Sequence, residues 1–362
     1  MAKSQSSQND MSLKSNLQFS QRLQYGIYHA LDHFVGSEKG FSLTKNSRRR
    51  YYRNLLAYLK ERGEGQVLPI ERRSNLSVKE FKAHYLKKGI PVVLENAAKD
   101  WSCVKKWSFS YFKELHGEDE IVVADQEKIE NEYLHTTLAE VIDGINTGNG
   151  RYYRFYPLLQ KHPEHILDFD YKWLKAHRNS TALFESFQVF LGGDKTLTPI
   201  HSANLCNLFT QVVGEKQWYL YHHHNTAIID PKMGKKIYRS APHKKPSGPF
   251  NPFQADYSSP YELFRYINGF TAHLKPGDVL WNPPFYWHAV QNQGMSIGVG
   301  YRWFSPFYCF KISALYSLLD FLVFDPPIWK SLKVAKEDGN FIHLLETGRL
   351  EEYLSKKGKK AN

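Results

Sequence analysis

The sequence has few cysteines: Cys103, Cys206 and Cys309 are the only ones among its 362 residues. Three cysteines without a CxxC pair argue against a disulfide framework and against a cysteine-rich zinc module. The first ten residues are polar and lack the apolar core of a secretory signal. We therefore expect a cytoplasmic protein.

Long hydrophobic runs are also lacking. The most apolar stretch, from Phe307 to Phe324, contains Lys311 and Asp320 and stops before Pro326, so it is short for a membrane span. We expect no transmembrane segment and interpret this stretch as a helix that is buried or forms an interface. No nucleophile elbow, P-loop or GxGxxG occurs, so hydrolase, kinase and dinucleotide-binding functions have no support.

Aromatic residues are abundant. They make up 15% of the chain, as 23 Phe, 23 Tyr and 8 Trp, a content that suits broad β-sheet faces better than a helical bundle. The formal charge is +12, and residues 1–65 hold 11 Lys and Arg against 5 Asp and Glu. Composition thus favours a mainly β domain that carries a basic N-terminal extension.

The chain divides into three parts. Residues 1–66 are predicted to form a basic helical arm with a disordered start, 67–305 a β-rich domain, and 306–362 a helical segment. Between about 185 and 305, short β-branched or aromatic runs alternate with turn signals such as Gly214-Glu215-Lys216, which would join the strands NLFTQVV and QWYLY. Many short strands with tight turns predict a sandwich or a barrel.

Two histidines stand out in this domain, each on or beside a predicted strand. His201 lies in TPIHSANLCNLF and His288 in WNPPFYWHAV. Because alternate residues of a strand share a face, Ala203, Leu205 and Asn207 should point the same way as His201, whereas Ser202 and Asn204 should point the other way. Imidazoles bind transition metals, and two so distant in sequence can meet only if the sheet curls into a barrel.

At these segments the chain, from about residue 68 to 305, resembles the JmjC-like cupin family. This family of iron and 2-oxoglutarate oxygenases includes the asparaginyl hydroxylase that acts on hypoxia-inducible factor. Its first motif, TPxHxD, is matched by Thr198 to Ala203, and a later Pro- and Trp-containing motif by Pro284 to His288. The resemblance implies a double-stranded β-helix with flanking helices, and iron ligands at His201 and His288.

The same resemblance implies a 2-oxoglutarate site. Lys216 matches the lysine that binds the distal carboxylate, and Thr198, Asn207 and Tyr153 match its helpers, whereas Gly300 replaces an asparagine of some members. A buried dicarboxylate needs a paired cation to offset its desolvation. Alternatively, Lys216 is an exposed hairpin lysine and Asn207 a satisfied barrel residue.

The sequence departs from the family at the third iron ligand, where Ala203 replaces the carboxylate. Asn204 is the adjacent polar residue, but strand alternation turns it to the opposite face. Other acids, Glu185, Asp194 and Asp256, have no spacing that recommends them. A triad of two histidines and one carboxylate is the usual iron site, so this vacancy leaves the chemistry open.

Three hypotheses follow. In the first, the vacancy binds chloride and the protein is a halogenase; in the second, two histidines, 2-oxoglutarate and water hold the iron of a hydroxylase. In the third, the metal is lost and the barrel is a binding module or pseudoenzyme. The substrate could be a small molecule, a protein or RNA. The C-terminal helices are candidates for forming a homodimer.

A second histidine group, His222-His223-His224, follows the predicted strand QWYLY. Consecutive side chains on a strand or loop diverge, so we interpret the three as loop residues without a shared metal. His273 and Cys206 are predicted to lie away from the site.

Overall fold

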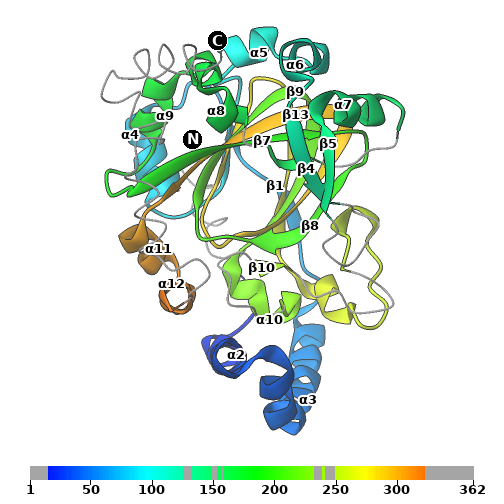
Figure 1. The fold of residues 1–362 in the computed structure, drawn as a ribbon. Helices are drawn as coiled ribbons and strands as arrows, with labels where there is room; N and C mark the ends of the chain where they lie inside the picture. Colours follow the sequence, from blue (N-terminus) through cyan, green and yellow to red (C-terminus); the bar gives the residue numbers. More distant parts are fainter. Residues whose placement is uncertain are drawn as a thin grey trace.

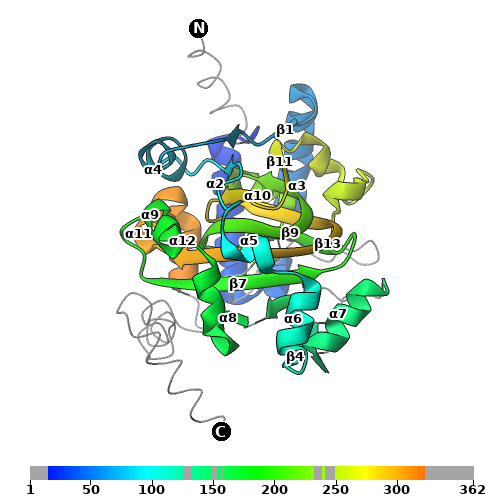
Figure 2. The ribbon, with the colours of Figure 1, turned by 90° about the horizontal axis from the view of Figure 1, so that it is seen from above.

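The computed structural model of the chain describes residues 15–124, 133–148, 153–156, 158–231, 239–240 and 249–322. Strands curl into one mixed sheet, and helices lie around it (Figures 1 and 2). The predicted architecture, a mainly β double-stranded β-helix with flanking helices, is therefore confirmed. The predicted disordered start and residues 323–362 of the C-terminal segment lie outside the described residues.

The barrel sheet has eleven strands, and a separate hairpin has two. The sheet contains β1 (Val67–Pro69), β2 (Arg72–Arg73), β3 (Val92–Leu94), β6 (Tyr153–Tyr156), β7 (Phe184–Gly192), β8 (Leu197–Ser202), β9 (Cys206–Tyr221), β10 (Arg239–Ser240), β11 (Gly269–Leu274), β12 (Val279–Asn282) and β13 (Trp287–Phe304). The hairpin contains β4 (Glu120–Ala124) and β5 (Tyr133–Thr137).

The helices flank this sheet at both ends of the chain and over one of its faces (Figures 1 and 2). They are α2 (Phe19–Val35), α3 (Ser37–Arg62), α4 (Val78–Phe81), α5 (Ser102–Lys106), α6 (Phe109–His116), α7 (Leu138–Asn146), α8 (Leu158–Lys161), α9 (Tyr171–His177), α10 (Thr226–Ile229), α11 (Pro306–Ile312) and α12 (Ala314–Phe321). Shorter turns of helix are η1 (Lys82–Leu86), η2 (Pro163–Asp168), η3 (His223–Asn225), η4 (Pro252–Gln254) and η5 (Glu262–Tyr266). Within the described ranges, none of the helices has the length and apolarity to cross a membrane.

The long strands β9 and β13 run antiparallel to each other through the middle of the sheet. The first part of β13 also pairs with β8 and its second part with β7. In the same way, the first part of β9 pairs with β12 and its second part with β11. Each long strand therefore belongs to both halves of the barrel, which closes the sheet around an interior.

One strand prediction needs correction here, and it concerns Gly214. The runs NLFTQVV and QWYLY are one strand, β9, and not two strands joined by a turn. Gly214 has φ 63°, and a Cβ at this position would clash with the carbonyl oxygen of Met295 on β13. The β9–β13 register shifts here, between Gln293 and Ile297, so Gly214 lies opposite a bulge of β13 and β9 continues without reversing.

The two faces of the sheet pack against different partners. Phe190, Phe209, Trp218 and Leu280 belong to a cluster made almost entirely of strand residues, which fills the barrel interior. The alternating strand residues, including Trp281, belong to a larger cluster with helices α5, α6 and α7. Strand alternation thus separates an interior face from a helix-covered face.

The apolar stretch from Phe307 forms two helices where the sequence predicted one. Ser313 is extended between α11 and α12, and its hydroxyl accepts a hydrogen bond from the backbone N–H of Tyr316. A serine at this position caps the second helix, which explains the break.

The N-terminal helices α2 and α3 form a hairpin that is held by a buried ion pair. The Arg48 guanidinium donates to both carboxylate oxygens of Asp32, at 3.0 and 2.6 Å, and to the carbonyl oxygen of Tyr28 at 3.2 Å. Only 7% of the Arg48 side chain and 11% of the Asp32 side chain are exposed. Bidentate geometry and burial make this pair the main polar link between the two helices.

We predict that Asp32→Asn destabilises the α2–α3 hairpin by about 3 kcal/mol, because it leaves the Arg48 cation buried without its anion. Amide hydrogen exchange in α2 and α3 should then become roughly 100-fold faster. The control is Glu61→Gln, which removes an exposed carboxylate of α3. Unchanged exchange in Asp32→Asn would show that the ion pair does not hold the hairpin.

Candidate functional site

His201 and His288 meet inside the barrel. They lie on the adjacent strands β8 and β13 in direct register, and their ring centroids are 4.1 Å apart. Both side chains are buried. The structure therefore brings together the two histidines that the sequence predicted as metal ligands.

Backbone carbonyls set the tautomer of both rings. Nδ1 of His201 lies 2.8 Å from the carbonyl oxygen of Pro199, and Nδ1 of His288 lies 3.0 Å from that of Tyr286. Because a carbonyl oxygen only accepts, both Nδ1 atoms carry the proton, and Nε2 holds the lone pair of the neutral ring. This is how protein histidines are oriented for metals, so the pair fits two ligand positions of an iron ion.

The histidines share a cavity with side chains from three neighbouring segments. Its lining consists of His201, Ala203, Leu205, Asn207, Asn282, Pro283, Tyr286, His288 and Arg302. Ala203, Leu205 and Asn207 are the residues that strand alternation placed on the face of His201. The carbonyl oxygen of Ala203 accepts a hydrogen bond of 2.8 Å from the backbone N–H of Phe285, which ties the two histidine segments together.

No carboxylate lines this cavity within the described residues. Asn204 lies beyond the end of β8 at Ser202, so strand alternation does not fix its direction, and it is absent from the lining of the cavity. Of the three acids considered, Glu185 pairs with Arg178, Asp194 accepts from the N–H of Gly294 at 2.7 Å, and Asp256 from that of Ser258 at 2.9 Å. The third ligand position therefore has no carboxylate candidate in the described cavity.

Arg302 is a lining residue that sequence reasoning missed. It lies on β13 directly opposite Asn207 of β9, and its guanidinium carbon lies 5.6 Å from the ring centroid of Phe190. Its position depends on the register of the two long strands, so no pattern in the nearby sequence predicts that Arg302 lines the cavity. Among its described lining residues, the cavity thus has a cation and no carboxylate.

Lys216 is buried in the barrel, not exposed on a hairpin. Its Nζ donates to Oδ1 of Asn292, the residue opposite it on β13. A Cβ on Gly298 would clash with the ring of Phe209 and lie 3.1 Å from Cε of Lys216, so the glycine gives both side chains their room. Burial lowers the pKa of Lys216 to about 7, and an anion bound beside it would offset that desolvation.

The other predicted 2-oxoglutarate residues differ in their placement. Asn207 is buried, and neither atom of its side-chain amide has a hydrogen-bond partner, so it is not a satisfied barrel residue. A Cβ on Gly300 would lie 2.9 Å from Oδ1 of Asn207. Thr198 is buried opposite Val290 and does not line the cavity. Tyr153 lies in β6, and its side chain is outside the described residues.

Aromatic rings support the histidines from within the barrel. Trp218 stacks on His288 with 5.5 Å between centroids, and Phe209 packs edge-on against Trp218 at 4.9 Å. Trp218 and Lys216 are two positions apart on β9, with Gln217 between them, so both side chains face the interior. The stack fixes the plane of His288 and excludes water from the space beside it.

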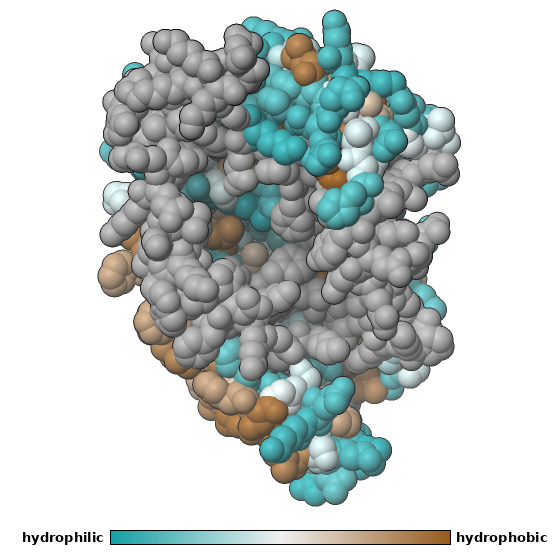
Figure 3. All heavy atoms as spheres, viewed as in Figure 1, coloured by the Kyte–Doolittle hydropathy of each residue, from teal (hydrophilic) through white to brown (hydrophobic). Residues whose placement is uncertain are grey.

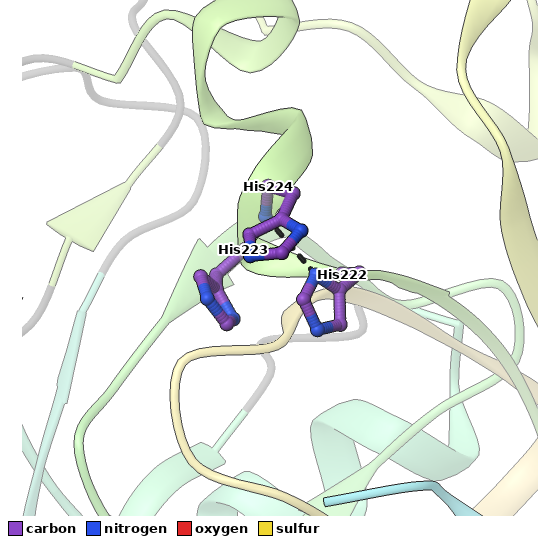
Figure 4. A group of neighbouring side chains, drawn as sticks. All are labelled: His222, His223 and His224. Atoms are coloured by element: carbon purple, nitrogen blue, oxygen red, sulfur yellow. Dashed lines mark hydrogen bonds between the residues drawn. The ribbon is translucent and has the colours of Figure 1, made fainter. Parts of the chain in front are cut away.

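The tract His222-His223-His224 contradicts the expected divergence (Figure 4). Strand β9 ends at Tyr221 and the 3-10 turn η3 begins at His223, so the three ring centroids lie only 4.1 to 4.5 Å apart. Nδ1 of His222 accepts the backbone N–H of His224 at 3.2 Å. Through this hydrogen bond, His222 caps the N-terminus of the turn η3. The tract therefore lies outside a strand, as the predicted loop required.

A larger pocket, of about 440 Å³, lies between α3, α10 and η5. It shares no lining residue with the histidine cavity. Its charged lining residues are Arg53, Asp230 and Glu262, and it contains no histidine. This pocket is the larger of the two, but the smaller cavity contains the two histidines that could bind a metal. We therefore take the smaller cavity as the candidate active site.

Known proteins resemble the chain over the region that forms the barrel. It matches the family described as cupin-like domain over residues 78–309. It is 25% identical over 254 residues to JmjC domain-containing protein D of Dictyostelium discoideum, with 62% of this chain and 53% of that protein covered. For lysine-specific demethylase 8 of Xenopus tropicalis the identity is 25% over 246 residues, with 63% and 51% covered.

A third relative is tRNA wybutosine-synthesizing protein 5 of Homo sapiens, which is 23% identical over 261 residues, with 66% of this chain and 79% of that protein covered. The chain spans about half the length of the first two relatives. The family match covers well over half of the chain and includes both histidine segments, the buried lysine and the strands that carry them. The chain therefore belongs to the cupin-like domain family.

Proposed function

We propose that the histidine cavity is an iron and 2-oxoglutarate site and that the chain is an oxidoreductase. The observation that carries this proposal is that one barrel contains two adjacent histidines, each with Nε2 unprotonated, and a buried lysine. Relatives named as a lysine-specific demethylase and a (3S)-lysyl hydroxylase support an oxidative function. The substrate stays open among small molecules, proteins and RNA.

Each residue has a separate task in this proposal. His201 and His288 bind the iron, Lys216 binds the distal carboxylate of 2-oxoglutarate, and the amide of Asn207 donates to an oxygen of the same ligand. The family resemblance adds Thr198 and Tyr153 as further contacts. Iron with 2-oxoglutarate supplies the oxidising chemistry when bound. The protein orients the two ligands, and the rings behind them keep bulk water out.

Ala203 and Arg302 influence which further ligand the iron can bind. Without a carboxylate, one more coordination position is open to water or to a small anion. The Arg302 guanidinium in the same lining favours an anion over a neutral ligand. Chloride at this position would make the protein a halogenase, and water would make it a hydroxylase.

Iron and 2-oxoglutarate binding can be measured directly by an anaerobic titration of the apoprotein. We expect a visible charge-transfer band when both are present, and its loss in His201→Ala, since one of the two protein ligands is removed. The control His273→Ala removes a half-exposed histidine of β11 and should keep the band. A shift of the band with chloride would support the halide position. If no band forms at saturating iron, the site is not an enzyme site and the barrel is a binding module.

The pKa of Lys216 predicts how 2-oxoglutarate affinity depends on pH. The ligand binds the protonated amine, and its pKa in the free protein is about 7. Binding above this pH must therefore take up a proton, and the affinity should weaken about tenfold per pH unit between pH 8 and 9. Calorimetry at pH 7, 8 and 9 measures this slope.

Two variants test the assignment of that slope. Lys216→Met should bind weakly with no pH dependence over this range, whereas Lys275→Met, which replaces an exposed lysine, should keep the wild-type slope. A flat profile in the wild-type protein would mean that Lys216 does not pair with the ligand.

We further propose that two copies of the chain associate through an apolar face on α2, α11 and α12. Its exposed members are Phe19, Leu23, Ile27, Phe307, Phe310, Leu318 and Phe321. Helices α2 and α12 lie side by side, since a Cβ on Gly26 would lie 3.1 Å from Leu315. Figure 3 shows hydrophobic side chains along the lower left of the molecule, over the region of these helices. An exposed face of this kind is typical of an interface.

Light scattering after size exclusion tests this association. The wild-type chain should elute as a dimer, and Phe310→Asp with Phe321→Asp should give a monomer, because two buried carboxylates would destabilise the interface. The control pair is Leu115→Asp with Leu167→Asp, which changes exposed leucines outside the face. A monomeric wild type, or a dimer in the first double variant, would contradict the proposal.

A further inference from the structure

We propose that His116, His162 and Glu164 form a second metal site, for a divalent transition cation of the zinc class, on the helical layer outside the barrel. One ligand atom from each residue lies within 4.8 Å of the other two. His116 ends α6, and His162 and Glu164 lie at the start of η2. None of the three lines the cavity of His201 and His288.

Hydrogen bonds set the tautomer of His162. Its Nε2 lies 2.7 Å from a carboxylate oxygen of Asp119, which can only accept, so Nε2 carries the proton. The lone pair of the neutral ring is therefore on Nδ1, which lies 3.6 Å from Oε1 of Glu164. A carboxylate that holds the far nitrogen of a ligand histidine is a recurring feature of metal sites.

His116 is oriented through a longer chain of hydrogen bonds. Nδ1 of His165 donates to Oδ2 of Asp168 at 3.2 Å, so Nε2 of His165 holds a lone pair. That nitrogen lies 2.7 Å from Nε2 of His116, which must then be the donor. Nδ1 of His116 is left with the lone pair, as in His162.

Asp168 anchors this chain in the protein. It is buried, and its carboxylate accepts a hydrogen bond of 2.7 Å from Nε1 of Trp107 and pairs with Lys106. The anchor explains why His165 keeps its proton on Nδ1. Five supporting groups thus leave both Nδ1 atoms unprotonated, and Glu164 adds a carboxylate to the group.

Ring stacking and exposure complete the site. The His116 and His162 rings stack at 3.6 Å between centroids with 19° between their planes, so the two imidazoles lie against each other. The side chains of His162 and Glu164 are 22% and 48% exposed, so an ion can enter from solvent. Two imidazoles and one carboxylate with an open fourth position are a ligand set that zinc accepts. The His222 group is a weaker candidate because its Nδ1 already caps a turn.

The test is a zinc titration of the full chain in a His201→Ala, His288→Ala background, which removes the barrel pair. Competition with a chromophoric chelator should show zinc binding that Glu164→Gln or His162→Ala weakens at least tenfold. Zinc should also raise the melting temperature of the background protein but not that of its Glu164→Gln version. Cobalt, titrated in place of zinc, reports nitrogen and oxygen ligands through its visible spectrum.

Glu164→Gln decides the result if His162→Ala fails to fold. It changes a half-exposed carboxylate and leaves the hydrogen bonds of the three histidines intact, so its melting temperature without metal should equal that of the background. Glu114→Gln removes an exposed carboxylate of α6 and should bind zinc like the background. Equal zinc affinity in the Glu164→Gln and Glu114→Gln versions, or no zinc binding at all, would overturn the proposal and leave a purely structural hydrogen-bond network.

Discussion

The pairing of β9 with β13 is the interaction on which the rest of this structure depends. Its register places Lys216 opposite Asn292 and Asn207 opposite Arg302, and β13 carries His288 to His201 on β8. The contact between Lys216 and Asn292 therefore depends on the register of these two strands. A shift of one residue in either strand would turn the site residues to the helix-covered face.

The barrel interior carries basic groups with no acidic side chain among the described residues of the histidine cavity. Lys216 is fully buried with a neutral amide as its hydrogen-bond acceptor, and Arg302 lines the cavity itself. A buried cation such as Lys216 is costly without an anion. The barrel interior is therefore suited to an anionic ligand, as the proposed dicarboxylate site requires.

Local patterns predicted some contacts correctly and others wrongly, for identifiable reasons. The alternation that put Ala203, Leu205 and Asn207 beside His201 agrees with the lining of the cavity. The turn expected at Gly214 is instead a continuous strand opposite a bulge of β13, because a glycine with positive φ serves equally well in both. The three consecutive histidines converge because the strand ends just before them, and strand geometry no longer applies.

By itself, the sequence determined the mainly β class, the two histidines with their strand context, and the alanine at the usual carboxylate position. These features depend on residue type and on neighbours within a few positions along the chain. Only the tertiary structure decided that Lys216 is buried, that Arg302 enters the cavity, and that His116 meets His162 across 46 residues of chain. Those contacts depend on strand register and helix packing, which join distant segments and leave no local signal in the sequence.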